Sequence, residues 1–151
     1  MNIRKANKED TNAIVSLVKE GLSGFGFDYS ARTSEADLND IEEAYTNNGG
    51  SFLIIEDEGE LVATGALKKI SDGIFKIRKM YVQKRYRNQG YGKKILESLL
   101  QEASNKKAKV INLETSKLMK SAIALYRSYG FEESEGKAES PRCDMLMTKK
   151  L

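Results

Sequence analysis

Residues 77–92, IRKMYVQKRYRNQGYG, decide the fold of this chain. Strand-forming residues end at Val82, and the glycine-rich segment 87–92 leads directly into an amphipathic run. The apolar residues of that run fall on one helical face: Ile95, Leu96, Leu99, Leu100 and Ala103. We therefore predict a strand, a glycine-rich loop and a helix. Because free N–H groups and the positive end of the helix dipole meet at a helix start, the loop predicts an anion site suited to phosphate.

The glycine spacing selects among phosphate-binding loops. The P-loop form requires Gly-Lys-Ser/Thr, and the dinucleotide form requires a third glycine, and both features are absent. The pattern that fits is [R/Q]-x-x-G-x-[G/A], with Arg87, Gly90 and Gly92 in register. For the hexapeptide taken alone, a glycine-rich turn without a ligand is the alternative.

Length and composition describe an ordinary globular chain. At 151 residues, with 40% hydrophobic and 31% charged residues, we expect one domain spanning 1–151. No apolar run approaches the roughly 18–20 residues of a membrane span, and the first ten residues lack the apolar core of a signal peptide. The single cysteine, Cys143, fits a reducing compartment, so we expect a cytoplasmic protein. Because there is no histidine, we expect no metal site and no Ser-His-Asp triad.

Charge is distributed unevenly along the chain. Residues 1–60 carry 13 acidic and 5 basic side chains, whereas residues 61–109 carry 13 basic and 3 acidic ones. This asymmetry suggests a cationic ligand near the first part and an anionic ligand near the second, with plain solvated surface as the alternative.

Periodicity and turn residues place the remaining elements. We predict strands at 1–5, 51–57, 61–70, 74–82, 110–116, 131–134 and 144–150. Helices are expected at 9–20, stopped by Gly21, at 34–45 with Ser34 as N-cap, after Gly90, and at 118–129. Between the first two helices lies a glycine-rich loop with three aromatic anchors, which we interpret as a lid over the acceptor or as an ordinary connection: Phe25, Phe27 and Tyr29.

The strand at 74–82 changes its phase. Phe75 and Ile77 occupy odd positions, whereas Met80 and Val82 occupy even positions, so a regular strand cannot bury both pairs on one face. We predict a β-bulge near residues 78–79, which turns backbone groups toward a ligand; burial of both faces is the alternative.

Three motifs together resemble the GNAT superfamily of acetyl-CoA-dependent N-acetyltransferases. They are MYV at 80–82, RNQGYG at 87–92, and an LE-x(7)-A-x-x-LY-x-x-x-GF segment at 113–131. The resemblance covers essentially the whole chain. It implies an α/β (α+β) fold with a mostly antiparallel sheet of about seven strands, flanked by four helices in the order β-α-α-β-β-β-α-β-α-β-β.

The resemblance also implies a cofactor site and a proton donor. Acetyl-CoA would bind along the bulged strand and the glycine-rich loop and leave as CoA; the implied residues are Met80, Tyr81, Val82, Arg87, Asn88, Gln89, Gly90, Tyr91, Gly92 and Lys93. Acetyl would pass directly to an amine. Tyr126 matches the tyrosine that protonates the leaving thiolate, and helix packing is its alternative role.

The catalytic base is less well marked. The histone-acetylating branch of the superfamily carries a glutamate where this chain has Lys76. The branch that acetylates ribosomal-protein N-termini carries one twelve residues before the tyrosine, where this chain has Glu114. Glu114 is therefore our candidate base, directly or through water; a charge on a half-exposed strand is the alternative. Met119 replaces an asparagine of many members, and Lys84 replaces a common proline.

The acceptor class stays open at this stage. Acidic residues of the first part suggest an acceptor with positive charge, a small-molecule amine or an amino acid: Asp28, Glu35, Asp37 and Asp40. The alternatives are a protein N-terminal or lysine acetyltransferase, and a sensor that binds acyl-CoA without turnover. We expect neither nucleic acid nor membrane as a partner, and a homodimer is left open.

Overall fold

The computed structural model describes residues 1–151 and places one seven-stranded sheet at the centre of the chain. The strands are β1 (Asn2–Lys5), β2 (Ser51–Asp57), β3 (Glu60–Ser71), β4 (Ile74–Val82), β5 (Val110–Thr115), β6 (Glu132–Ser134) and β7 (Met145–Lys150). The helices are α1 (Thr11–Ser23), α2 (Ile41–Ala44), α3 (Tyr91–Asn105) and α4 (Lys120–Ser128). The sheet order is β1-β2-β3-β4-β5-β7-β6, and only the β4–β5 pair is parallel. The predicted fold class and element order are confirmed.

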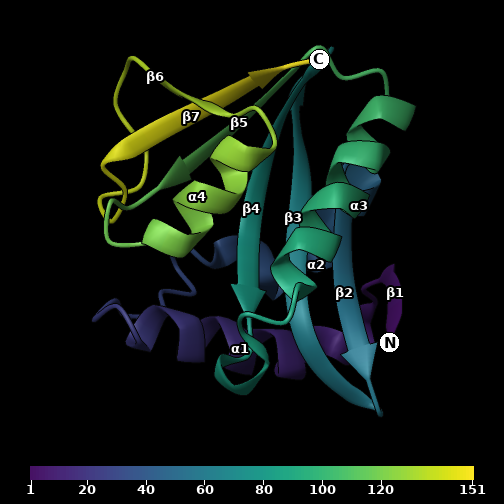
Figure 1. Ribbon diagram of the computed structural model, residues 1–151. Helices are drawn as coiled ribbons and strands as arrows, with labels where there is room; N and C mark the ends of the chain where they lie inside the picture. Colours follow the sequence, from purple (N-terminus) through teal and green to yellow (C-terminus); the bar gives the residue numbers. More distant parts are fainter.

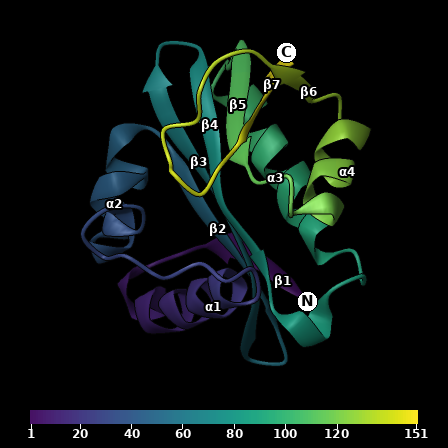
Figure 2. The same cartoon turned by 90° about the vertical axis from the view of Figure 1, so that its left-hand side faces the viewer.

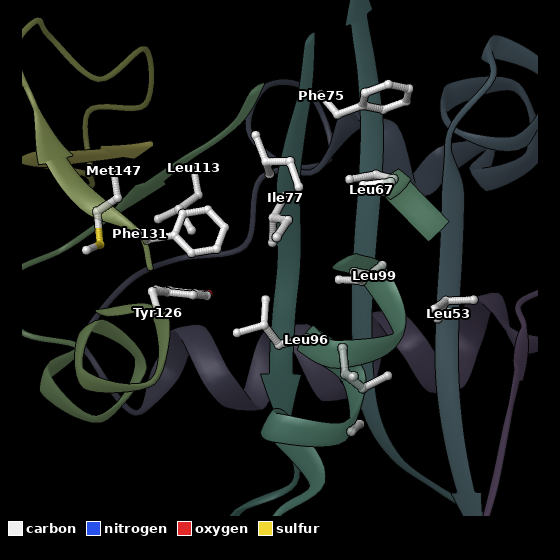
Figure 3. Close-up of a cluster of buried hydrophobic side chains, with 14 of the residues drawn as sticks. Leu53, Leu67, Phe75, Ile77, Leu96, Leu99, Leu113, Tyr126, Phe131 and Met147 are labelled. Carbon is white, nitrogen blue, oxygen red and sulfur yellow. The ribbon is translucent and has the colours of Figure 1, made fainter. Parts of the chain in front are cut away.

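Helices cover both faces of the sheet. α1 and α2 lie on one face, and α3 and α4 lie on the other (Figures 1 and 2). Side chains that alternate along the strands belong to two separate hydrophobic cores, one on each face of the sheet. The core under α1 and α2 contains Phe52, Ile54 and Ala66. The core under α3 contains Leu53 and Leu67. Figure 3 shows the core on the α3 and α4 side, including the ring of Tyr126 beside Phe131. No helix in the structure combines the length and the apolar character that crossing a bilayer requires.

β4 and β5 separate soon after they meet. They pair only at residues 74–76 and 110–112, and both strands then continue without each other (Figure 1). β5 keeps its whole length paired with β7 on its other side. The parallel pair therefore opens into a splay that gives access to the middle of the sheet.

The predicted bulge is confirmed in β4. Ala66 pairs with Arg78 and Thr64 pairs with Tyr81, so a single β3 residue faces two residues of β4. Lys79 adopts a left-handed φ of 55°, and its carbonyl accepts a hydrogen bond of 2.7 Å from the Thr64 hydroxyl. The bulge resets the side-chain phase, so Ile77 and Met80 both reach the α3 side.

Two predicted boundaries are wrong. α1 passes through Gly21 and ends at Ser23, so Gly21 does not stop the helix. A glycine is required there because a side chain at this position would collide with the ring of Tyr81. The helix expected at 34–45 is broken. A 3-10 turn at Ala36–Asn39 precedes α2, and Asp40, at φ −151°, is extended and caps α2 in place of Ser34 by accepting from the Glu43 amide.

Candidate active site

The start of α3 presents a row of free backbone amides. No amide from Asn88 to Lys93 donates a hydrogen bond to the chain; the first bonded one is Lys94, which donates to Gly90. Gly90 makes this turn possible with a φ of 86°, a conformation that side chains disfavour. We call residues 87–93 the glycine loop. Six N–H groups at the positive end of a 15-residue helix form a binding place for phosphate oxygens.

The edge of β4 that faces the splay carries free backbone groups as well. Gln83 donates to the Val62 carbonyl, so these two residues form a hydrogen-bonded pair. Such pairs occur at every second residue of an antiparallel ladder, so Tyr81 is also hydrogen-bonded to β3, whereas Val82 is not. The amide and carbonyl of Val82 consequently point away from β3, toward the splay. There the Val82 carbonyl accepts a 3.1 Å bond from Arg87 Nε of the glycine loop. The predicted cofactor residues of β4 and of the glycine loop are thus adjacent.

A cavity of about 830 Å³ runs through the splay. Its lining combines core-side residues such as Met80 and Tyr126 with residues of the opposite sheet face, such as Lys76 and Glu114. We call the part on the α1/α2 face the polar chamber; it is walled by Lys68, Lys76, Arg78, Glu114 and, across the mouth, Glu35 and Arg142. The cavity therefore passes between β4 and β5 from one face of the sheet to the other.

Tyr126 lies where the two sides of the cavity meet. The residue is 6% exposed and its ring packs edge-on against Phe131, with the centroids 5.8 Å apart. Its hydroxyl makes no hydrogen bond within the chain, and the residue lines the cavity. Burial raises the pKa of Tyr126 above its ordinary value near 10, so the phenol stays neutral and can donate.

Glu114 projects into the polar chamber from β5. Its Oε2 lies 2.6 Å from Lys76 Nζ, and its Oε1 accepts a 3.0 Å bond from the Ser140 amide. Burial alone would raise the pKa of this carboxyl, but the Lys76 bond and the backbone amides of Glu139 and Ser140 outweigh it and hold the pKa below its usual range. Glu114 is therefore a carboxylate that is already hydrogen-bonded within the chain and keeps free lone pairs.

Glu35, Asp37 and Asp40 are committed to contacts inside the fold. Glu35, 2% exposed, forms a two-pronged ion pair with Arg142, with its oxygens 2.7 and 2.9 Å from the guanidinium. Asp37 Oδ1 lies 3.3 Å from Lys79 Nζ, and the Tyr45 hydroxyl donates to its other oxygen. Asp40 caps α2. The expectation of a positively charged acceptor is therefore not supported for Glu35, Asp37 and Asp40, which already have partners inside the fold. The carboxylate of Asp28 is exposed and has no partner in the chain.

The Glu35–Arg142 pair joins two loops that are distant in the sequence. Arg142 also donates to the Asp28 carbonyl at 2.6 Å, and the Ser30 amide donates to Glu35 at 2.7 Å. Burial favours the neutral carboxyl, yet Arg142 and the Ser30 amide keep the pKa of Glu35 below its usual range. The β6–β7 loop is thereby fastened to the α1–α2 loop across the mouth of the chamber.

The three aromatic residues of the α1–α2 loop, Phe25, Phe27 and Tyr29, lie in three different environments. Phe27 lines the cavity. Tyr29 packs against the α1/α2 core beneath Lys19, and Phe25 is 37% exposed outside the cavity. Of the three, only Phe27 is therefore placed to cover an acceptor in the cavity.

Sequence reasoning missed three cations of the polar chamber: Lys68, Arg78 and Arg142. Arg78 follows Lys76 by two on β4, so the alternation of polar residues there was the available signal. Arg142 lies in a loop whose composition carries no periodic signal, and only the fold brings it to Glu35.

Comparisons with known proteins agree with this geometry. The model of the Acetyltransferase (GNAT) family matches residues 16–131. The chain is 26% identical to the uncharacterized N-acetyltransferase YjgM of Escherichia coli (strain K12), over 99% of this chain and 94% of that protein. It is 32% identical to N-acetyltransferase family 8 member 2 of Rattus norvegicus over 70% of this chain, and it spans 49% of that relative.

Solved structures share the fold. An acetyltransferase of the GNAT family from Staphylococcus aureus Mu50 superposes with a TM-score of 0.91 at 24% identity, covering 99% of this chain and 98% of that one. A phosphinothricin acetyltransferase from Sinorhizobium meliloti, solved in complex with AcCoA, superposes with a TM-score of 0.79 at 20% identity, covering 99% and 88%.

Proposed function

Because the chain belongs to the Acetyltransferase (GNAT) family and acetyl-CoA is the cosubstrate of this enzyme class, we propose that it moves acetyl to a primary amine of a small molecule or amino acid. The amine nitrogen attacks the thioester carbonyl, so a C–N bond forms and the C–S bond breaks. The amine loses a proton, the sulfur gains one, and the products are an N-acetyl amide and CoA. The single observation that carries the proposal is the cavity through the splay, with free amides beside it.

In this proposal the cofactor lies on the α3 side of the splay. The pyrophosphate binds the free amides of the glycine loop, and the pantetheine arm bonds to the free amide of Val82 on the exposed edge of β4, because the backbone of Tyr81 is paired with β3. Exposed Arg87 and Lys93 add positive charge beside the phosphates. Met80, which lines the cavity, then borders the thioester.

Tyr126 donates to the leaving sulfur. Its hydroxyl has no partner in the chain, so the departing thiolate meets a free donor in a water-poor setting. The neutral phenol stabilises the negative charge that develops on sulfur and supplies the proton as CoA leaves.

Glu114 receives the proton of the amine through water. Because its pKa lies below the usual range, Glu114 is ionised at neutral pH and stabilises the positive charge that develops on the attacking amine. The proton then passes from Glu114 to solvent. Lys76 fixes the position of the carboxylate from the neighbouring strand.

A small acceptor fits better than a protein segment. A peptide requires an open groove, whereas Arg142 and Glu35 fasten two loops across the mouth of the polar chamber. Phe27 adds an apolar surface on the same wall. We further propose that residues 1–151 act as one N-acetyltransferase domain, since one sheet connects both ends.

The test is an amine panel with acetyl-CoA that carries ¹³C in its acetyl group. Free CoA is followed by a thiol reagent and the product by mass spectrometry. We expect labelled N-acetyl amine and CoA in equal amounts. CoA release without labelled amide, or no release with any amine, contradicts the proposal.

A further inference from the structure

We infer that the acceptor carries a carboxylate next to its amine, and that Arg78, assisted by Lys68, binds that carboxylate. The inference rests on the proposed function, because it names the class of amine that the polar chamber accepts. It follows from which charges in the chamber have partners and which do not.

Three cations gather on one patch of the sheet. Lys68 of β3 lies directly opposite Lys76 of β4, and Arg78 follows two positions along β4 on the same face. All three line the cavity. Like charges directly opposite each other destabilise a sheet, so this arrangement opposes folding unless an anion compensates it. Such a local conflict is typical of a binding site.

The carboxylates nearby compensate only Lys76 among these three cations. Glu114 is bonded to Lys76, and Glu35 is bonded to Arg142. The other two carboxylates of the lining, Glu135 and Glu139, are exposed on the β6–β7 loop and form no ion pair. The chamber therefore holds more positive than negative charge once its ion pairs are formed.

Arg78 and Lys68 are the half-buried cations left over. Lys68 has no hydrogen bond or ion pair in the chain. Arg78 makes one bond, from Nη2 to the Ser34 carbonyl at 3.2 Å, which leaves most of its five N–H donors free. A guanidinium fork binds a carboxylate through two parallel bonds, and a nearby ammonium adds charge. An acceptor with only positive charge would instead meet repulsion here.

The position of Arg78 suits an acceptor whose amine reaches the thioester. Arg78 directly precedes the bulge at Lys79, and the next residues, Met80 and Tyr81, line the same cavity as Tyr126. A carboxylate held at Arg78 therefore anchors the acceptor on the α1/α2 face while its amine points into the splay.

The experiment compares amino acids with the amines that differ only by loss of the carboxylate, for example phenylalanine with 2-phenylethylamine. Initial rates of CoA release give kcat/KM for each member, and the ratio within a pair is the readout. For the best pair of the panel we expect a ratio of at least about tenfold in favour of the amino acid, as for a charged hydrogen bond lost. Arg78→Leu should bring that ratio close to one.

A matched variant separates this site from general damage. Arg127→Leu removes an exposed guanidinium at the end of α4, away from the cavity, and should keep the ratio. Because both members of a pair react on the same protein, a loss of folding cancels in the ratio. A ratio near one in the wild type, or a ratio that Arg78→Leu leaves unchanged, overturns the inference.

Calorimetric titration of the CoA-saturated protein with the same amino acids separates the two proposals. Release from amines without a carboxylate preference supports the proposed function and overturns this site. Binding of amino acids that Arg78→Leu abolishes, with no release from any amine, supports this site and contradicts the proposed function. No release together with no binding contradicts both.

Discussion

The glycine loop presents backbone amides from one short segment, whereas the polar chamber is formed by side chains from five segments of the chain. The loop needs two left-handed residues, Asn88 and Gly90, and the first turn of α3. The chamber needs Glu35 and Arg142, 107 residues apart, and Lys76 and Glu114, 38 residues apart. In the proposed function, cofactor binding is therefore encoded by one local segment, whereas acceptor choice depends on the finished fold.

The largest effect is expected at Tyr126, the proposed proton donor. Tyr126→Phe keeps the ring packed on Phe131 but removes the free hydroxyl, so kcat should fall by about 10²–10⁴-fold with little change in CoA affinity. Steady-state rates of CoA release measure it. Tyr129→Phe, at the C-cap of the same helix, is the matched control, because its hydroxyl bonds to Glu97 outside the cavity. If Tyr126→Phe stays within about twofold of wild type, Tyr126 only packs the core.

The next effect concerns the stability of the polar chamber. Arg142→Met leaves the carboxylate of Glu35 buried without its partner, so the free energy of unfolding at pH 7 should fall by about 3 kcal/mol. Urea unfolding measures it, with the exposed Arg127→Met as control, and CoA affinity should change little. An unchanged unfolding free energy would show that the pair does not fasten the two loops.

The same pair predicts a pH dependence with a defined sign. The pKa of Glu35 is lowered in the folded protein, so its stabilisation is complete above the unfolded carboxyl pKa of about 4.3 and is lost as the pH falls through the lower folded value. The difference between wild type and Arg142→Met should therefore be largest near neutral pH and narrow in acid.

A smaller effect on turnover is expected from Glu114→Gln, because water can still carry the proton away. The loss in kcat/KM at pH ~7 should lie below the ~10²-fold that is typical of a group acting directly. The loss should shrink as the pH approaches the pKa of the amine, near 10.4 for a lysine-type amine, because neutral amine is then abundant. A pH–rate profile from pH ~6 to ~10 on one accepted amine measures it. Profiles that stay parallel would assign Glu114 to holding Lys76 and the substrate, with the proton leaving through water alone.

These contrasts explain what the sequence could predict. The phase change between Ile77 and Met80 predicted the bulge, and Gly90 predicted the turn before α3. Both could be predicted because they depend on local backbone geometry. The break before α2 was missed, since Glu35 and Asp37 are drawn into contacts with Arg142 and Lys79 that no local pattern encodes. The polar chamber could not be assembled for the same reason.

A titration with CoA tests the central claim, that the glycine loop holds the cofactor through its backbone. A Cβ at Gly92 would lie 3.6 Å from Leu125 and 3.7 Å from Val82, ordinary contacts, so the fold should tolerate a side chain there. Gly92→Glu brings bulk and negative charge to the free amides and should weaken CoA binding by at least about tenfold. Gln101→Glu adds the same charge on an exposed position of α3 and should bind CoA like wild type. Wild-type affinity in a well-folded Gly92→Glu variant would contradict the account.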